Sequence, residues 1–167
     1  MDSENYDDKD PLFLPLQSWD IYAMHLAKLK EERKKEGDLK ILTGLKQKHN
    51  WKSNLKKILR GSYESLVLTD RKIVIEWASE GFLKMTGYPV EYALGKSPRF
   101  LQGKNTTPQS RKTVRENLKT RKVFSVDLIN YRKNGEEYIC RVQIHPLENE
   151  QEELIHFLAL EKEVKKI

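Results

Sequence analysis

The chain has 167 residues and a formal net charge of +6, which leaves room for one domain with an appendage and excludes a two-domain dinucleotide-binding enzyme or a full eight-stranded barrel. Its hydrophobic fraction of 38% is low and its charged fraction of 34% is high, so part of the chain is expected to be exposed helix or tail. The acidic start, the lack of an apolar run near the roughly 18 residues of a membrane span, and the single Cys140 argue against a secretory signal, a membrane anchor and a disulfide framework, and they predict a cytoplasmic protein.

Residues 1–16 are predicted to be an acidic tail, and residues 17–60 a helical extension. Six acidic residues and one lysine occur in the first 20 positions. An apolar stripe at helical spacing follows, and Gly37-Asp38 indicates a break, so two or three amphipathic helices are expected. The first stripe comprises Trp19, Tyr22, Leu26 and Leu29. Such stripes must bury against the following domain or against a second copy of the chain.

Residues 28–60 are strongly basic, with twelve lysines and arginines against four acidic residues. A basic stretch can bind nucleic acid. Here the cations recur at helical spacing with acids and leucines between them, which is more typical of a solvated helix face. Nucleic acid is therefore not the expected partner.

Residues 61–164 are predicted to form a separate domain with strands at both ends and helices between them. The strands are expected at 65–69, 73–77, 123–131, 137–145 and 154–163, and the helices at 80–86, 90–94 and 108–119. Asn134-Gly135 is a strong hairpin signal between the third and fourth strands. This order predicts an α+β fold, a five-stranded antiparallel sheet with helices on one face, preceded by the helical extension. A pocket between sheet and helices would hold a small ligand.

Three segments carry a resemblance to a known family. Residues 78–88 read ASEGFLKMTGY, residues 94–103 read LGKSPRFLQG, and residues 130–135 read NYRKNG. Together they resemble a PAS domain, closest to the light-oxygen-voltage (LOV) subgroup. The resemblance implies a five-stranded sheet with helices on one face and a sensory role.

LOV domains bind flavin mononucleotide and form a light-driven adduct through a cysteine just before the arginine of the RFLQG stretch. In this chain that position is Pro98, which has no thiol. The resemblance therefore implies that adduct photochemistry does not run here. Cys140 stands where the family usually has a second asparagine facing the flavin ring. A cysteine there either points into the pocket or is a small buried apolar residue, and we favour the second interpretation.

The resemblance implies four candidate flavin contacts, which are Arg99, Gln102, Arg115 and Asn130. The two arginines match those that hold the flavin phosphate, for which a guanidinium fork is suited; the alternative, which the sequence alone favours, is that they are surface cations on a helix-rich face. Gln102 and Asn130 match amides near the ring; the alternatives are an exposed loop amide for Gln102 and a strand-edge or turn hydrogen bond for Asn130. Glu161 replaces the glutamine of the last strand; an ionised carboxylate only accepts hydrogen bonds, so it would repel a ring carbonyl unless burial keeps it protonated.

No catalytic motif and no metal site is expected. His145 and His156 lie on neighbouring predicted strands, but two histidines without a third ligand make a weak metal site. No output module is expected after residue 164. The signal is therefore expected to reach the N-terminal helices, through a homodimer or through docking within the chain.

Four functions are consistent with these observations. The first is a non-enzymatic PAS signalling module that responds to a small ligand or a protein partner. The second is a flavin-binding blue-light or redox sensor without the cysteinyl adduct. The third is a scaffold or dimerisation protein whose pocket is filled by side chains. The fourth is nucleic-acid binding through residues 28–60, which would show steep salt dependence.

Overall fold

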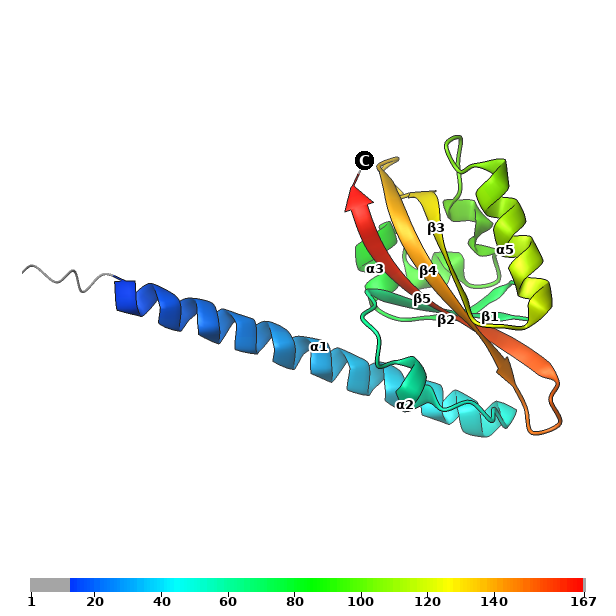
Figure 1. The fold of residues 1–167 in the computed structure, drawn as a ribbon, viewed down its shortest axis with the longest axis horizontal. Helices are drawn as coiled ribbons and strands as arrows, with labels where there is room; N and C mark the ends of the chain where they lie inside the picture. Colours follow the sequence, from blue (N-terminus) through cyan, green and yellow to red (C-terminus); the bar gives the residue numbers. More distant parts are fainter. Residues whose placement is uncertain (1–12, 167) are drawn as a thin grey trace, which may run out of the picture. The chain divides into compact units, whose positions relative to one another are not determined.

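The computed structural model describes residues 13–166, and the chain divides into two units between Lys40 and Ile41. The first long element is helix α1 (Phe13–His49), and a short helix α2 (Leu55–Ile58) follows it (Figure 1). Most of the predicted acidic tail lies outside the described residues, and α1 already includes residues 13–16.

The predicted break at Gly37-Asp38 is wrong, because α1 runs through both residues without interruption. A glycine inside a helix costs only about 1 kcal/mol relative to alanine, which the rest of a 37-residue helix can absorb. Ion pairs spaced four residues apart support the turns before it, Lys28 with Glu32 and Lys35 with Glu31.

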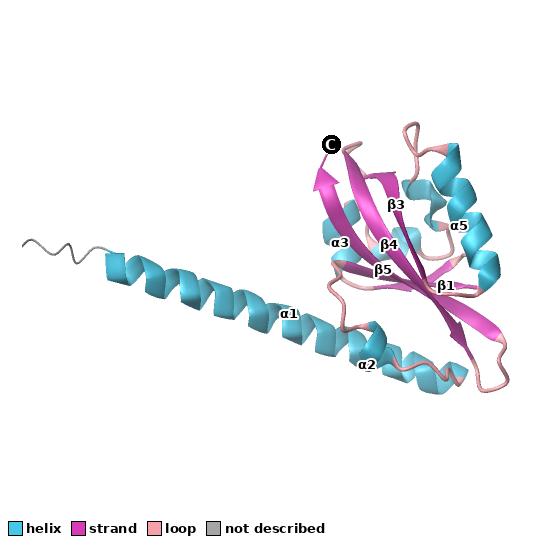
Figure 2. Cartoon of the chain, viewed as in Figure 1, coloured by secondary structure: helices cyan, strands magenta, loops and turns pink. Residues whose placement is uncertain are grey.

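The second unit contains the predicted five-stranded antiparallel sheet, in the order β2-β1-β5-β4-β3. Figure 2 draws its strands in magenta. Its strands are β1 (Ser65–Asp70), β2 (Ile75–Ala78), β3 (Phe124–Tyr131), β4 (Glu137–Glu148) and β5 (Leu154–Lys166). The last strand thus lies at the centre of the sheet, between the first strand and β4. The α+β prediction is confirmed.

Helices from the middle of the chain pack on one face of this sheet (Figure 1). They are α3 (Gly81–Thr86), α4 (Val90–Ala93), the 3-10 helix η1 (Pro98–Leu101) and α5 (Pro108–Thr120). Two clusters of buried side chains lie between the layers, one around Phe82 and Leu101 and one around Tyr138 and Cys140. The helices are where the sequence predicts them, except that η1 is an addition.

The turn between β1 and β2 is longer than the sequence predicts. Asp70 Oδ1 accepts hydrogen bonds from the backbone N–H groups of Lys72 and Val74, both at 2.8 Å. Ile73 has a positive φ of 63° and therefore belongs to the turn. As a result β2 begins at Ile75 rather than at residue 73.

The opposite face of the sheet is joined to the segment that precedes β1. Trp51 is 2% exposed, and its indole Nε1–H donates to His156 Nδ1 on β5 at 3.1 Å. The other ring nitrogen of His156 lies 2.9 Å from Glu76 Oε2 on β2. Since an indole can only donate, His156 carries its proton on Nε2 and donates it to Glu76. Leu42, Leu55 and Leu59 of the same segment are also buried.

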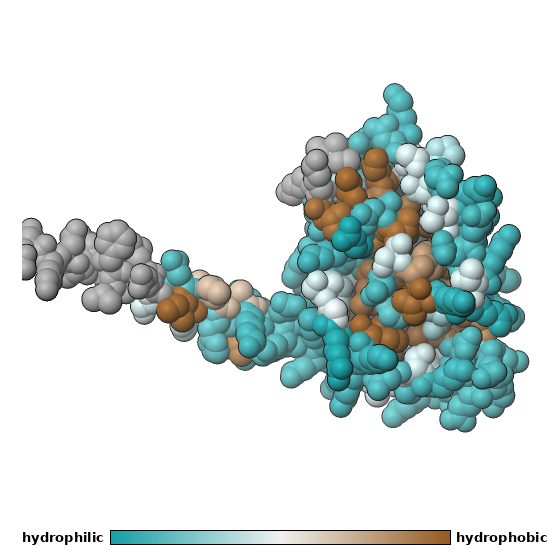
Figure 3. Space-filling model, in the orientation of Figure 1, coloured by the Kyte–Doolittle hydropathy of each residue, from teal (hydrophilic) through white to brown (hydrophobic). Residues whose placement is uncertain are grey.

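The first apolar stripe of α1 is solvent-exposed in the described chain. Trp19 is 68% exposed and Tyr22 is 54% exposed, and apolar side chains interrupt the hydrophilic surface of this helix (Figure 3). None of the helices within residues 13–166 combines the length and the apolar character needed to cross a bilayer.

Candidate functional site: a cation-lined cavity between sheet and helices

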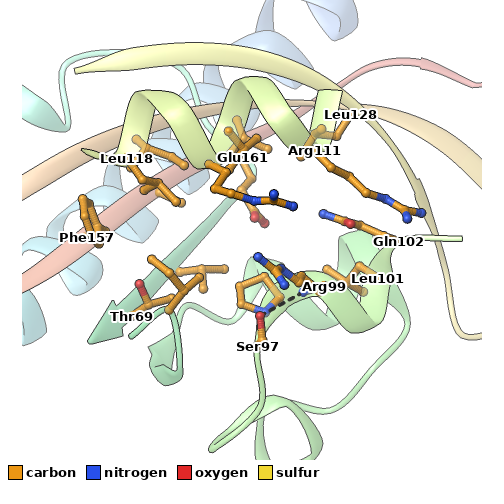
Figure 4. Close-up of a pocket in the computed structure, with 18 of the residues that line it drawn as sticks. Thr69, Ser97, Arg99, Leu101, Gln102, Arg111, Leu118, Leu128, Phe157 and Glu161 are labelled. Atoms are coloured by element: carbon orange, nitrogen blue, oxygen red, sulfur yellow. Dashed lines mark hydrogen bonds between the residues drawn. The ribbon is translucent and has the colours of Figure 1, made fainter. Parts of the chain in front are cut away.

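A cavity of about 830 Å³ lies between the sheet and the elements η1 and α5 (Figure 4). Strands β1, β3, β4 and β5 provide its floor, with apolar residues such as Leu128 and Phe157. Small-molecule sites usually occupy roughly 300–1,000 Å³. The core is thus not filled by its own side chains at this place.

All four residues named as candidate contacts line this cavity, namely Arg99, Gln102, Arg115 and Asn130. Arg99 belongs to η1, whose start is capped by Ser97 and carries Pro98 in its first turn. Arg115 reaches the cavity from α5. Whether these side chains hold a ligand stays a prediction; the structure brings them together around one space.

The loop between η1 and α5 is fastened to β3, which places Gln102 beside Asn130. These two residues form an antiparallel backbone bridge. Thr106 Oγ1 donates to the Ile129 carbonyl at 2.5 Å and accepts from Gly103 N–H at 3.0 Å. Asn130 is 5% exposed and its Oδ1 has no hydrogen-bond partner in the described chain. A residue that lines the cavity thus carries an unpaired, buried amide oxygen.

Gly103 is required by a close approach to the Tyr131 ring. A Cβ on Gly103 would lie 2.3 Å from Tyr131 Cε2. The ring is held because its hydroxyl donates to Glu137 Oε1 at 2.6 Å and accepts from the Asn105 backbone N–H at 3.0 Å.

We expect Gly103→Ala to lower the free energy of unfolding by about 2 kcal/mol, since it inserts a methyl group where the ring cannot move. Gly44→Ala, at an open position inside α1, is the matched control and should raise it by about 0.5–1 kcal/mol. Urea unfolding measures both, and equal effects would contradict the steric explanation.

The mouth and wall of the cavity carry a high density of positive charge. Six cations line it, which are Arg71, Arg99, Arg111, Arg115, Lys119 and Arg121. Within residues 13–166 none of the six forms a salt bridge. Arg111 Nη2 donates to the Gly103 carbonyl at 3.0 Å. The charges are thus not neutralised by acidic side chains of the described chain.

Among residues 13–166, Glu161 is the one acidic residue that lines the cavity. It is 4% exposed, and its Oε2 has no hydrogen-bond partner in the described chain. Burial, only partly offset by the Ser65 hydroxyl, raises the pKa of this carboxyl to about 7. The group is therefore a neutral acid below that pH.

Cys140 does not line the cavity. It is fully buried in the apolar cluster that contains Met85 and Leu128, as expected for a small apolar residue. Burial, with the nearby Glu161, raises the pKa of its thiol, so the reactive thiolate is disfavoured.

The two histidines considered for metal binding are not cross-strand partners. The register pairs His145 with Leu158 and His156 with Leu147. In the part of the chain that the structure describes, no group of three histidine, cysteine or acidic side chains is arranged to bind a metal ion. His156 instead contacts Trp51 and Glu76.

Sequence reasoning missed the other cavity cations. Arg111 lies four residues before Arg115 on the same helix, so helical spacing alone would have placed both on one face. Arg71 and Arg121 come from the ends of elements, the first from the β1–β2 turn and the second from the left-handed cap of α5 with φ of 53°. Nothing in the pattern of the sequence predicts where those two point.

Known proteins resemble this unit in sequence. A blue-light-activated histidine kinase of Brucella canis is 36% identical over 97 residues, which make up 58% of this chain and 19% of the kinase. The corresponding kinase of Brucella anthropi is 35% identical over the same length. The chain thus spans only about a fifth of the curated relatives that it matches.

Solved structures resemble it in fold. The LOV domain of the blue-light photoreceptor Aureochrome1 in its light state superposes with a TM-score of 0.60 and 30% identity, over 67% of this chain and 90% of that one. The PAS domain of the fruit-fly ELK potassium channel gives a TM-score of 0.58 with 25% identity, over 66% and 94%. Residues 64–166 match the sequence pattern of the PAS domain. The chain therefore belongs to the PAS domain family, and LOV domains are among its similar relatives.

Proposed function

We propose that this protein is a non-enzymatic sensory module whose cavity binds a phosphate-bearing heterocycle, with flavin mononucleotide as the first candidate. The observation that carries the proposal is a cavity of about 830 Å³ whose six cations have no acidic partner in the described chain. Arginines bind phosphate oxygens through paired, charge-assisted hydrogen bonds. The cavity also disfavours a scaffold whose pocket is filled by side chains.

The donor set fits such a ligand. Arg99, Arg111 and Arg115 would hold a phosphate, and Gln102 and Asn130 would face the polar edges of a ring. Asn130 Oδ1 has no hydrogen-bond partner in the described chain, so a ligand N–H could donate a hydrogen bond to it. A bound flavin supplies visible absorption and one- or two-electron redox chemistry. Since Pro98 has no thiol, binding would not involve the cysteinyl adduct.

The double variant Arg99→Ala, Arg115→Ala should weaken binding of flavin mononucleotide at least about 100-fold, because each hydrogen bond to a charged group contributes about 1.5–3 kcal/mol. Quenching of flavin fluorescence during titration with the full chain measures the dissociation constant. The absorption spectrum of the protein as purified shows whether flavin is already bound.

The control removes the same charge outside the cavity. Lys104→Ala with Lys112→Ala takes two exposed cations from the same region, neither of which lines the cavity. Their loss should change affinity only through long-range attraction, which salt screens. Equal weakening by both pairs, or no binding by the unmodified chain, would refute the phosphate site.

We propose that β5 transmits occupancy of the cavity to the opposite face of the sheet. Glu161 and Phe157 of this strand line the cavity, whereas His156 contacts Trp51 on the other face. Side chains alternate between faces along a strand, so one strand touches both sites. A ligand-dependent change in β5 would reach the segment that continues from α1.

The output of this sensor would act through the α1 segment, by homodimerisation or by docking within the chain. The exposed stripe Trp19, Tyr22, Leu26 and Leu29 supports this proposal. Light scattering of the full chain and of a Trp19→Asp, Leu26→Asp variant would test it. A dimer that the variant disrupts supports pairing; a monomer in both cases rules out the homodimer.

A further inference from the structure

His156 is a buried histidine on the central strand β5, on the sheet face opposite the cavity, and both of its ring nitrogens are used. The residue is 3% exposed. Its Nδ1 accepts a hydrogen bond from the Trp51 indole Nε1–H at 3.1 Å, which requires a lone pair on Nδ1. Its Nε2 carries the one ring proton and lies 2.9 Å from Glu76 Oε2. The hydrogen bond from Trp51 therefore exists only while His156 is neutral.

A second proton on the His156 ring would set two donors against each other. In an imidazolium both ring nitrogens donate, so Nδ1–H would point at the indole Nε1–H. Trp51 is 2% exposed, and its N–H would lose its acceptor where little water can replace it. The contact with Glu76 would become an ion pair, but the Glu76 side chain is 47% exposed, and exposed ion pairs contribute little. Protonation therefore favours separation of Trp51 from β5.

The other groups around His156 do not favour the cation. From the end of α1, the ring centroid of His49 lies 4.6 Å from that of His156, and Lys48 precedes His49. On β1 the cross-strand neighbour is Asp70, whose Oδ1 already accepts from two backbone N–H groups. On β4 the neighbour is the apolar Leu147. Burial, together with His156 and Lys48, lowers the pKa of His49, so positive charge is disfavoured on both rings.

We propose that His156 is a pH-sensitive switch that holds residues 51–59 on the sheet when it is neutral and releases them when it is protonated. Trp51, Leu55 and Leu59 of this segment are buried, so release would expose apolar surface. The sign follows from the lone pair on Nδ1: the segment is held above the range in which histidine ordinarily titrates, about pH 6.5, and is released below it. This inference does not depend on which ligand the cavity binds.

The test is a pH series from 8 to 5 on the full chain, with hydrogen exchange of the tryptophan indole N–H groups followed by nuclear magnetic resonance. His156→Gln is the matched variant, because its amide oxygen can accept from Trp51, its amide N–H can donate to Glu76, and it does not titrate. We expect the Trp51 indole N–H of the unmodified chain to exchange about tenfold faster at pH 5, relative to His156→Gln, than the same ratio at pH 8. Taking the ratio cancels the intrinsic effect of pH on exchange.

Two control variants identify the responsible histidine. His25→Gln changes an exposed residue of α1 and should behave as the unmodified chain. His49→Gln should keep most of the pH dependence, since it leaves the Trp51–His156 hydrogen bond in place. Loss of the pH dependence in His49→Gln but not in His156→Gln would overturn the proposal. An exchange ratio that is constant from pH 8 to pH 5 would overturn it as well.

The unmodified chain alone also tests the proposal, should His156→Gln fail to fold. The chemical shift of the Trp51 indole N–H should then follow a single protonation between pH 8 and pH 5, while the indole of Trp77 on β2 stays constant. A Trp51 shift that does not change with pH refutes the switch. A parallel change at Trp77 would mean that the whole sheet unfolds, which refutes a local release.

Discussion

Replacing Glu161 with glutamine should stabilise the protein in a strongly pH-dependent way, adding about 2–3 kcal/mol more to the free energy of unfolding at pH 8 than at pH 5. The carboxyl has a pKa of about 7 in the folded chain and 4.5 as an ordinary value. A raised pKa means that its contribution to stability is fully present below pH 4.5 and is lost as the pH rises through 7. Glutamine carries no charge at any of these values.

Urea unfolding without ligand, from pH 5 to pH 8.5, measures the difference. Any constant difference in side-chain packing between glutamate and glutamine cancels, because only the change with pH is interpreted. Glu150→Gln, where the side chain is exposed, should show no such trend. If the free energies of unfolding of the unmodified chain and of Glu161→Gln differ by the same amount at every pH, the buried carboxyl does not retain its proton on folding.

Trp51→Ala should lower the free energy of unfolding by about 4 kcal/mol, the range typical of a large aromatic removed from a core. Trp51 is 2% exposed, stacks beside His49 at a centroid distance of 5.9 Å and donates to His156. Trp51→Phe keeps most of the apolar area and loses the indole donor, so about 1 kcal/mol is expected from the hydrogen bond.

Trp19→Ala provides the comparison, because Trp19 is 68% exposed and should change stability by less than about 0.5 kcal/mol. Chemical unfolding followed by circular dichroism distinguishes the three variants. If Trp19→Ala and Trp51→Ala lower the free energy of unfolding by similarly small amounts, the segment before β1 does not pack on the sheet. The same variants, assayed with ligand, show whether the Trp51–His156 contact responds to the cavity.

The sequence was sufficient for the order of elements because periodicity changes visibly along the chain. A short β-type run at residues 65–69 corresponds to β1, the strand-like run at 123–131 corresponds to β3, and the Asn134-Gly135 turn joins β3 to β4. The predicted break at Gly37 is wrong because the interior of a long helix tolerates single, separated glycines, here Gly37 and Gly44, when ion pairs and length support it. The residues around Gly37 do not show by themselves whether the length of the helix and its ion pairs outweigh the cost of the glycine.

The sequence predicts a residue of the candidate site only where that residue belongs to a family motif or lies at helical spacing from one that does. Arg99 and Asn130 follow from the resemblance, and Arg111 follows from Arg115 by helical spacing. The unpaired state of Glu161 was not predictable, because it depends on which side chains from four other elements come within hydrogen-bond distance. Whether a buried polar atom has a hydrogen-bond partner depends on the folded cavity, and the amino-acid sequence does not show it.

The lack of acidic partners for the six cavity cations has a practical consequence for any ligand search. Like charges held around one hollow repel, so counter-ions from the buffer will gather there and raise the melting temperature on their own. Inorganic phosphate, sulfate or citrate would then compete with the compound under trial. Ligands should therefore be screened in dilute chloride, and each oxyanion should be tested separately. An increase in melting temperature caused by a buffer anion is then not mistaken for ligand binding.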